Sequence, residues 1–121
     1  MKLITAIVRP EKLDELIEIL IGSRVHGLTV SDVRGFGCQF GKPAQGADLD
    51  LGLARKATLL PKVRLDLVVQ DDDAEGLVET LAKHSRTDTI GDGKIWVSTV
   101  DSVLRVRTGD RDRAAISPSE G

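Results

Sequence analysis

The residues in this chain best suited to chemistry form the stretch Gly91-Asp92-Gly93-Lys94, which an apolar run follows at once. Glycine lets backbone N–H groups turn toward an anion, and lysine supplies a nearby cation, a combination typical of phosphate binding. A P-loop, however, needs GxxxxGK[ST] at the start of a helix, and no Ser or Thr follows this lysine. A plain glycine-rich connection between a helix and a strand therefore remains an open alternative.

Three further cations could contribute to such a site. Arg105 and Arg107 stand two residues apart in the stretch LRVRTG, so on a strand they would share a face. Paired guanidinium groups suit phosphate recognition, although a solvated strand end is the more usual place for surface arginines. Lys62 follows a long irregular segment, and its alternative role is that of a lysine protecting an edge strand.

Other kinds of chemistry find little support. His26, His84 and Cys38 lack the spacing of metal ligands, and no nucleophile elbow or catalytic triad is evident. The acidic run at residues 71–73 is better explained as the N-terminal turn of a helix than as a metal site.

Composition narrows the class of protein. The 121 residues are 40% hydrophobic and 30% charged with a net charge of −2, which predicts one soluble domain and no nucleic-acid binding. No apolar run approaches the ~20 residues of a membrane helix, and MKLITAIVRPEK predicts a first strand rather than a signal peptide. A single cysteine fits a reduced, cytoplasmic setting. Only 2% of residues are aromatic, and such a small aliphatic core favours an oligomer.

The pattern of apolar residues predicts the elements that hold these side chains. A strand buried on both faces is expected over 2–10, and a second strand over 27–36. Between them, a helix ending at Gly22 presents one apolar face made of Leu13, Leu16, Ile17, Leu20 and Ile21.

The second half repeats this order after an irregular segment, 37–59, of a length usually associated with function or disorder. A half-buried strand is expected over 62–70, and a helix over 71–85 in which Asp72 and Glu75 have capping-box spacing. A last strand region spans 94–107, with a break near Asp101, before a polar tail. Two βαβ units around one loop predict a ferredoxin-like α+β fold, an antiparallel sheet with both helices on one face.

These features, in this order, resemble the PII signal-transduction proteins. The resemblance rests on the loop after VRGFG, on LPKV, on TDTIGDGKIWV and on RVRTG, and it covers a single domain over residues 1–115, with a tail at 116–121. It implies a cytoplasmic homotrimer with ATP or ADP in the clefts between subunits. Thr87 to Lys94 would wrap the phosphates, Arg105 and Arg107 would reach them from the neighbouring subunit, and Thr29 and Val68 would line the adenine and ribose. The full set of implied nucleotide-binding residues is Thr29, Gly37, Cys38, Val68, Thr87, Ile90, Gly91, Asp92, Gly93, Lys94, Arg105 and Arg107.

The resemblance also implies an effector and a partner. In the family, Mg-ATP and 2-oxoglutarate bind together, so Gln39 would ligate the metal while Lys62, with Gly41 nearby, would pair with a carboxylate of the effector. Residues 37–59 would form the T-loop, which docks onto a partner such as an ammonium transporter or a metabolic enzyme. The expected docking residues are Phe40, Leu49, Leu51, Leu53 and Arg55, and the alternative is that the three leucines fold back on their own trimer.

Two departures from the family pattern leave the function open. Cys38 and Phe40 stand where the family has cations, so the preference among ATP, ADP and AMP is undecided, and the loop is longer than the family's. The chain has no tyrosine, and residues 37–57 have no Ser or Thr, which excludes uridylylation and adenylylation of this loop. The leading hypothesis is a non-catalytic sensor in nitrogen and carbon metabolism. The alternatives are a divergent sensor of ADP or AMP and bicarbonate, a slow ATPase using Lys94 and a magnesium ion held by Gln39, and a purely structural trimer.

Overall fold

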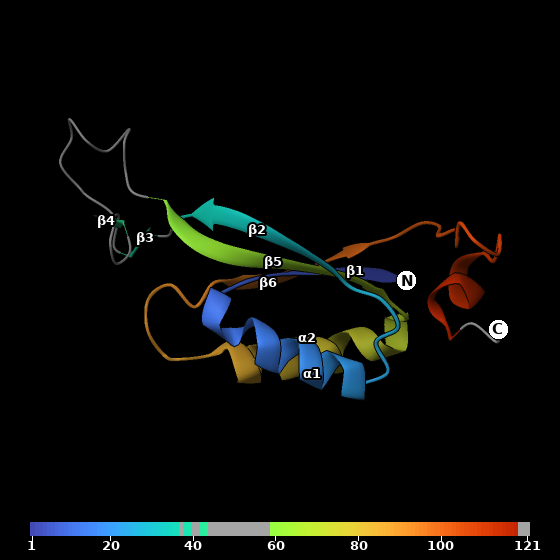
Figure 1. Ribbon diagram of the computed structural model, residues 1–121, viewed down its shortest axis with the longest axis horizontal. Coiled ribbons are helices and arrows are strands. Elements are labelled where there is room, and N and C mark those ends of the chain that lie inside the picture. The colour runs from blue at the N-terminus through green and yellow to red at the C-terminus, as the bar shows by residue number, and fades with distance from the viewer. Residues whose placement is uncertain (37, 40–41, 44–58, 119–121) are drawn as a thin grey trace.

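The computed structural model describes residues 1–36, 38–39, 42–43 and 59–118. Four strands form one antiparallel sheet in the order β2-β5-β1-β6. They are β1 (Lys2–Val8), β2 (Thr29–Gly35), β5 (Leu60–Val69) and β6 (Lys94–Thr99). Helices α1 (Leu13–Gly22) and α2 (Asp71–Ser85) both lie on one face of this sheet (Figure 1). The predicted ferredoxin-like fold is confirmed.

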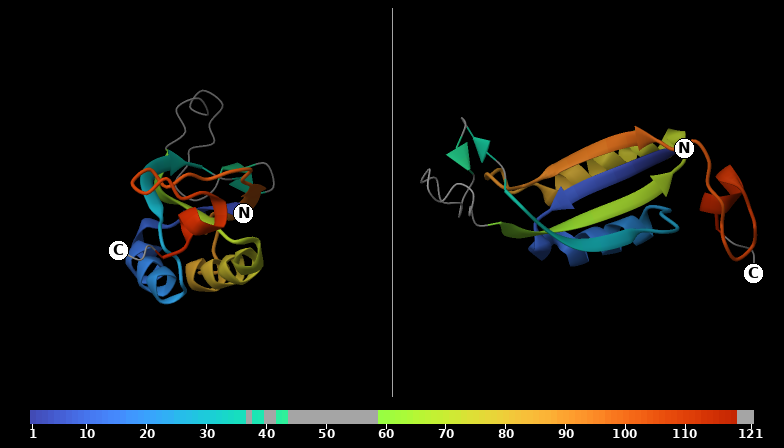
Figure 2. Two further views of the ribbon diagram at one scale, coloured as in Figure 1. Left: turned by 90° about the vertical axis from the view of Figure 1, so that its right-hand side faces the viewer. Right: turned by 90° about the horizontal axis from the view of Figure 1, so that it is seen from above.

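Short elements complete the description. A 3-10 turn, η1 (Pro10–Lys12), leads into α1, and another, η3 (Asp112–Ile116), lies near the C-terminus. The pair β3 (Cys38–Gln39) and β4 (Lys42–Pro43) forms a separate two-stranded sheet inside the segment expected to be an irregular loop. The C-terminal segment lies at the opposite end of the main sheet from β3 and β4 (Figures 1 and 2).

The core follows the predicted alternation. In β5, Val63, Leu65, Leu67 and Val69 are buried against the helices, while the residues between them face the other way. Ala74, Leu77 and Leu81 of α2 and Leu16 and Leu20 of α1 complete the core. Burial of β1 on both faces was predicted; on the face away from the helices Thr5 is buried, whereas Leu3 and Ile7 are only half-buried.

Two details of the helices differ from expectation. Ile21, predicted to lie on the apolar face of α1, is 70% exposed, whereas Leu20 beside it is fully buried. The predicted capping box of Asp72 and Glu75 is absent: Gln70 is the N-cap residue of α2, with no side-chain cap, and Asp72 lies inside the first turn. Asp71 instead pairs with the N-terminal ammonium group at 2.8 Å.

Candidate functional site

The glycine-rich stretch lies in the connection from α2 to β6, at the end of the sheet near β3 and β4 (Figure 1). Gly91 and Gly93 have φ values of 102° and 93°, which side chains other than glycine's rarely tolerate. A Cβ atom on Gly93 would lie 1.7 Å from the carbonyl oxygen of Ile7. Glycine is therefore required here so that the connection can press against the end of β1.

Asp92 holds this connection in shape. Its carboxylate accepts hydrogen bonds from the N–H groups of Thr87, at 2.8 Å, and Asp88, at 2.9 Å, and also from the Thr87 hydroxyl. The hydrogen bond from the Thr87 hydroxyl holds the pKa of Asp92 well below its usual range. Partial burial raises this pKa, but the Thr87 N–H and the Arg9 guanidinium lower it further. Two N–H groups of the predicted phosphate loop are thus already engaged by a carboxylate of the protein.

Arg9, at the end of β1, is the second organising residue, and the sequence analysis did not single it out. Its guanidinium donates to the Asp92 carboxylate at 3.1 Å, to the Thr89 hydroxyl at 2.8 Å and to the Ile90 carbonyl at 2.7 Å. Only 18% of its side chain is exposed. The sequence feature that could have identified Arg9 is a positive charge directly after the first strand. Because β1 and β6 are antiparallel neighbours, a residue at the end of β1 lies beside the start of β6.

Lys62 lies close to the same connection. Its ammonium group donates to the Gly91 carbonyl at 2.6 Å. Burial lowers the pKa of Lys62, and the positive charge of Arg9 lowers it further. Lys62 and Lys94 line one hollow of about 310 Å³, together with Ile7, Gly35, Phe36, Leu60, Ile90, Gly91, Gly93 and Trp96. The structure therefore brings the predicted effector lysine and the predicted phosphate loop together.

A second group of predicted residues meets at the other end of the sheet. Thr29, Val68 and Arg105 line a hollow of about 360 Å³, which also includes Asp66. Asp66 accepts a hydrogen bond from the buried Thr5 hydroxyl at 2.8 Å, and its bond from Arg64 lowers its pKa. Arg105 donates to Asp110 at 3.0 Å and to the Ser117 carbonyl.

The prediction that Arg105 and Arg107 share the face of a strand is wrong. Strand β6 ends at Thr99, and only Leu104 forms an isolated bridge, with Arg111. The chain then turns: the N–H of Gly109, whose φ is 78°, donates to the Arg105 carbonyl at 2.8 Å. Glycine in a left-handed conformation closes this turn, so alternation along a strand does not apply to the two arginines.

The two groups of predicted nucleotide-binding residues are far apart in one chain. Lys62 and Val68 are six residues apart on β5, and at ~3.3 Å per residue in a strand this separates the two hollows by roughly 20 Å. The connection that carries Lys94 and the segment that carries Arg105 lie at opposite ends of the sheet (Figure 1). A single nucleotide cannot contact both groups within one chain.

Some predicted residues cannot be placed. The structure gives the backbone of Cys38 and Gln39 in β3 and nothing on their side chains. Gly37, Phe40 and Gly41 lie outside the described residues, as do the predicted docking residues Leu49, Leu51, Leu53 and Arg55. Their roles stay predictions.

Among residues 1–36, 38–39, 42–43 and 59–118, no three His, Cys, Asp or Glu side chains gather in a way that could hold a metal ion. None of the helices described there has the length and hydropathy needed to span a membrane.

The fold and the two hollows define a ferredoxin-like protein with a glycine-rich, cation-flanked loop at one end of its sheet and an arginine-bearing turn at the other. Comparison with known proteins gives the family. The model of the family described as nitrogen regulatory protein P-II matches residues 1–110. The chain belongs to this family.

Three relatives illustrate the similarity. Nitrogen regulatory protein P-II 2 of Methanothermobacter thermautotrophicus is 44% identical over 118 residues, which cover 96% of this chain and 97% of the relative. Nitrogen regulatory protein P-II of Cereibacter sphaeroides is 45% identical over 116 residues, covering 96% and 100%. Nitrogen regulatory protein GlnK of Escherichia coli is 40% identical over 116 residues, with the same coverage.

Proposed function

We propose that this chain is a trimeric, non-catalytic signal-transduction protein that binds ATP or ADP in the clefts between its subunits. Mg²⁺ and 2-oxoglutarate bind with the nucleotide, and residues 37–59 pass the signal to a partner protein that acts in nitrogen or carbon metabolism. The relatives named as nitrogen regulatory proteins support the regulatory role and its setting.

The observation that carries the proposal is the separation of the predicted nucleotide residues into two groups at opposite ends of one sheet. The hollow with Lys62, Gly91, Gly93 and Lys94 includes none of Thr29, Val68 and Arg105, and the hollow with those three residues lacks the glycine-rich loop. A ring of subunits joins the two groups if one end of each sheet meets the other end of its neighbour's. One nucleotide then contacts the loop of one subunit and the arginines of the next.

The face of the sheet away from the helices supports assembly. Trp96 pairs in register with Thr5 and points to this face, and 44% of its surface is exposed. Leu3, Ile7 and Val68 point the same way, because they alternate with the core residues of β1 and β5. Apolar side chains on a sheet face that no described helix covers are accounted for by burial between subunits.

The donor set fits a nucleotide phosphate. Lys94, Arg105 and Arg107 supply cations, and guanidinium groups bind phosphate oxygens two at a time. Arg9 and Asp92 already fix the shape of the glycine-rich connection, so little ordering free energy is lost when the phosphates bind. Mg²⁺, held by Gln39 and phosphate oxygens, would neutralise part of the phosphate charge.

Lys62 explains how an effector could be sensed. In this structure its ammonium group is satisfied by the Gly91 carbonyl, within the phosphate loop itself. A carboxylate of 2-oxoglutarate would be a stronger partner than a carbonyl, because both groups are charged. An exchange of partners at Lys62 would connect the effector to the nucleotide loop and to the base of the T-loop, which joins β5 at Leu60.

One alternative has a specific observation in its favour. Cys38 replaces a cation that would touch the terminal phosphate, and Phe40 replaces a second one. A divergent sensor that binds ADP or AMP as well as ATP, with bicarbonate as its effector, would fit these two changes. Calorimetry with each nucleotide separates the two functions.

The test is calorimetric titration of the purified protein with ATP, ADP and AMP, each with Mg²⁺ and with or without 2-oxoglutarate. We expect ATP to bind, 2-oxoglutarate to bind only in its presence, and Lys94→Ala to weaken ATP binding by about tenfold or more. Lys83→Ala, which removes an exposed lysine from α2, is the matched control and leaves binding unchanged. Equal binding of all three nucleotides with no response to 2-oxoglutarate supports the alternative, and no nucleotide binding at all rejects both.

A further inference from the structure

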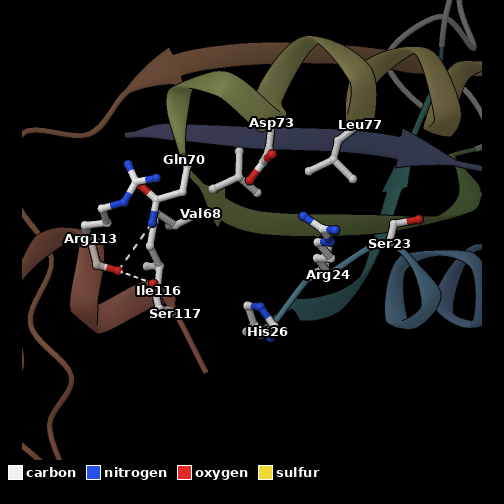
Figure 3. Close-up of a pocket in the computed structure, with 12 residues that line it drawn as sticks. Ser23, Arg24, His26, Val68, Gln70, Asp73, Leu77, Arg113, Ile116 and Ser117 are labelled. Carbon is white, nitrogen blue, oxygen red and sulfur yellow. Dashed lines mark hydrogen bonds between the residues drawn. The ribbon is translucent and has the colours of Figure 1, made fainter. Parts of the chain in front are cut away.

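A third pocket lies beside the Arg105 hollow, between the segment after α1, the start of α2 and η3 (Figure 3). It measures about 140 Å³, and its apolar lining includes Val69, Leu77 and Ile116. A pocket of this size admits a small molecule or ion rather than a polypeptide. Of its lining residues, only Val68 is among those that the resemblance assigns to the nucleotide.

The charged side chains that line this pocket are two arginines and one aspartate. Arg24 and His26 contribute from the segment between α1 and β2, and Arg113 contributes from η3 (Figure 3). Among the residues that the structure describes, the side chains of Arg24 and Arg113 have neither a hydrogen bond nor an ion pair. Asp73 of α2 lines the pocket as well, and it pairs with neither arginine. Both arginines are exposed, and a bound anion could pair with them without breaking an existing ion pair.

The backbone at Arg24 belongs to the end of α1. Its φ is 65°, a left-handed conformation that favours glycine. Arg24 follows the C-cap residue Ser23, and the Val25 N–H donates to the Leu20 carbonyl at 3.4 Å, as is common where a helix ends on a left-handed residue. The chain carries an arginine where the backbone geometry favours glycine.

Arg113 is connected to the predicted nucleotide site through η3. Its carbonyl accepts hydrogen bonds from the Gln70 side chain at 3.2 Å and from the Ser117 hydroxyl at 2.7 Å, both drawn in Figure 3. The Ser117 carbonyl in turn accepts a hydrogen bond from the Arg105 guanidinium. A ligand that binds the Arg113 side chain would therefore stabilise the segment that positions Arg105.

We propose that this pocket binds a small anion with a carboxylate or phosphate group between Arg24 and Arg113, and that the anion tightens the hold of residues 110–117 on Arg105. An anion that also bears an ammonium group, such as a free amino acid, would satisfy Asp73 as well. The binding site stands on the pocket alone, whereas its effect on Arg105 rests on the proposed function.

The experiment is direct calorimetric titration with three probes: inorganic phosphate, succinate and free glycine, all at one ionic strength set with sodium chloride. We expect at least one probe to bind the wild type, and Arg24→Gly and Arg113→Gln each to weaken it by about tenfold or more. Arg111→Gln is the matched control, because Arg111 adjoins the same 3-10 turn but does not line the pocket. Loss of glycine binding in Asp73→Asn would identify the amino-acid form of the ligand.

The outcomes separate the two proposals. If no probe binds, or if binding is equally strong in Arg24→Gly and Arg113→Gln, the anion site is wrong. If a probe binds and raises the affinity for ATP in the wild type but not in Arg113→Gln, the coupling to Arg105 is supported. If a probe binds the wild type and leaves its ATP affinity unchanged, that coupling is wrong. A protein that binds a probe but no nucleotide would refute the nucleotide proposal and leave the anion site established.

Discussion

Two cations at each end of the sheet differ in whether groups of the protein already pair with them. At the end that carries the glycine-rich connection, Arg9 and Lys62 are satisfied by groups of the protein: Asp92, Thr89 and two backbone carbonyls. At the other end, Arg24 and Arg113 line a pocket without partners among the described residues. The first pair shapes the backbone of a site in advance, and the second pair leaves charge available for a ligand. Removal of Arg9 should therefore destabilise the fold, and removal of Arg24 should not.

The largest effect is expected for Gly93→Ala. The added Cβ would overlap the Ile7 carbonyl oxygen and would hold an unfavourable φ of 93°. We expect a loss of roughly 3 kcal/mol in the free energy of unfolding, measured by urea denaturation at one protein concentration. Gly76→Ala is the control: it lies inside α2 with open space around it, and it should gain about 0.5–1 kcal/mol. Equal stability of the two variants would contradict the packing of the connection on β1.

Arg9→Ala comes next. It removes the hydrogen bonds to Asp92, Thr89 and Ile90 from a side chain that is mostly buried. The expected loss is about 2 kcal/mol, accompanied by faster amide exchange in residues 87–93. Arg86→Ala, in the same connection, removes only a loose, exposed pair with Asp88 at 3.8 Å and should change stability by less than about 0.5 kcal/mol. If the two variants behaved alike, Arg9 would not be an organising residue.

Asp92→Asn tests the same network through pH. Because hydrogen bonds lower the pKa of Asp92 in the folded chain, its stabilising contribution is complete above the unfolded pKa of about 4 and is lost as pH falls through the folded value. The variant should be less stable than the wild type by about 1.5 kcal/mol at neutral pH, and the gap should narrow below about pH 4. Denaturation at a series of pH values measures the gap, and a gap independent of pH would show that the charge of Asp92 is not what matters.

The smallest effect has the opposite sign. Arg24→Gly removes an unpaired cation and places glycine where the backbone is left-handed, which favours the folded state. Glycine also has more conformational freedom in the unfolded chain, which offsets part of this gain. We expect the free energy of unfolding to rise by about 0.5 kcal/mol. Arg24→Ala removes the same charge but keeps the strain, and it should show no gain. A loss of stability in Arg24→Gly comparable to that of Arg9→Ala would remove the contrast between the two ends.

The sequence predicted the fold well because its signals were periodic. Alternation in β5 placed Val63 and Leu65 correctly, and the helical stripe of α2 placed Leu77 and Leu81. The glycines of the connection were found because two of them flank an acid and precede a lysine, and Lys62 was found because it follows the long irregular segment. All of these signals depend on neighbours along the chain.

What the sequence could not show depends on pairing between distant segments. Arg9 reaches Asp92 only because β1 and β6 are adjacent and antiparallel. Arg105 and Arg107 were read as strand residues because RVRTG alternates, whereas Gly109 closes a turn there. The pocket between Arg24 and Arg113 brings residues from opposite ends of the chain together, and no motif marks it.

The central claim is that one nucleotide uses the glycine-rich end of one subunit and the arginine-bearing end of the next. The most direct test is co-expression of Lys94→Ala and Arg107→Ala chains with different affinity tags, followed by ATP titration of the mixed assembly. Each variant alone should bind ATP about tenfold or more weakly than the wild type, and each mixed trimer should regain one cleft of wild-type affinity in which both halves are unaltered. Mixed assemblies that form but recover no binding would contradict the account.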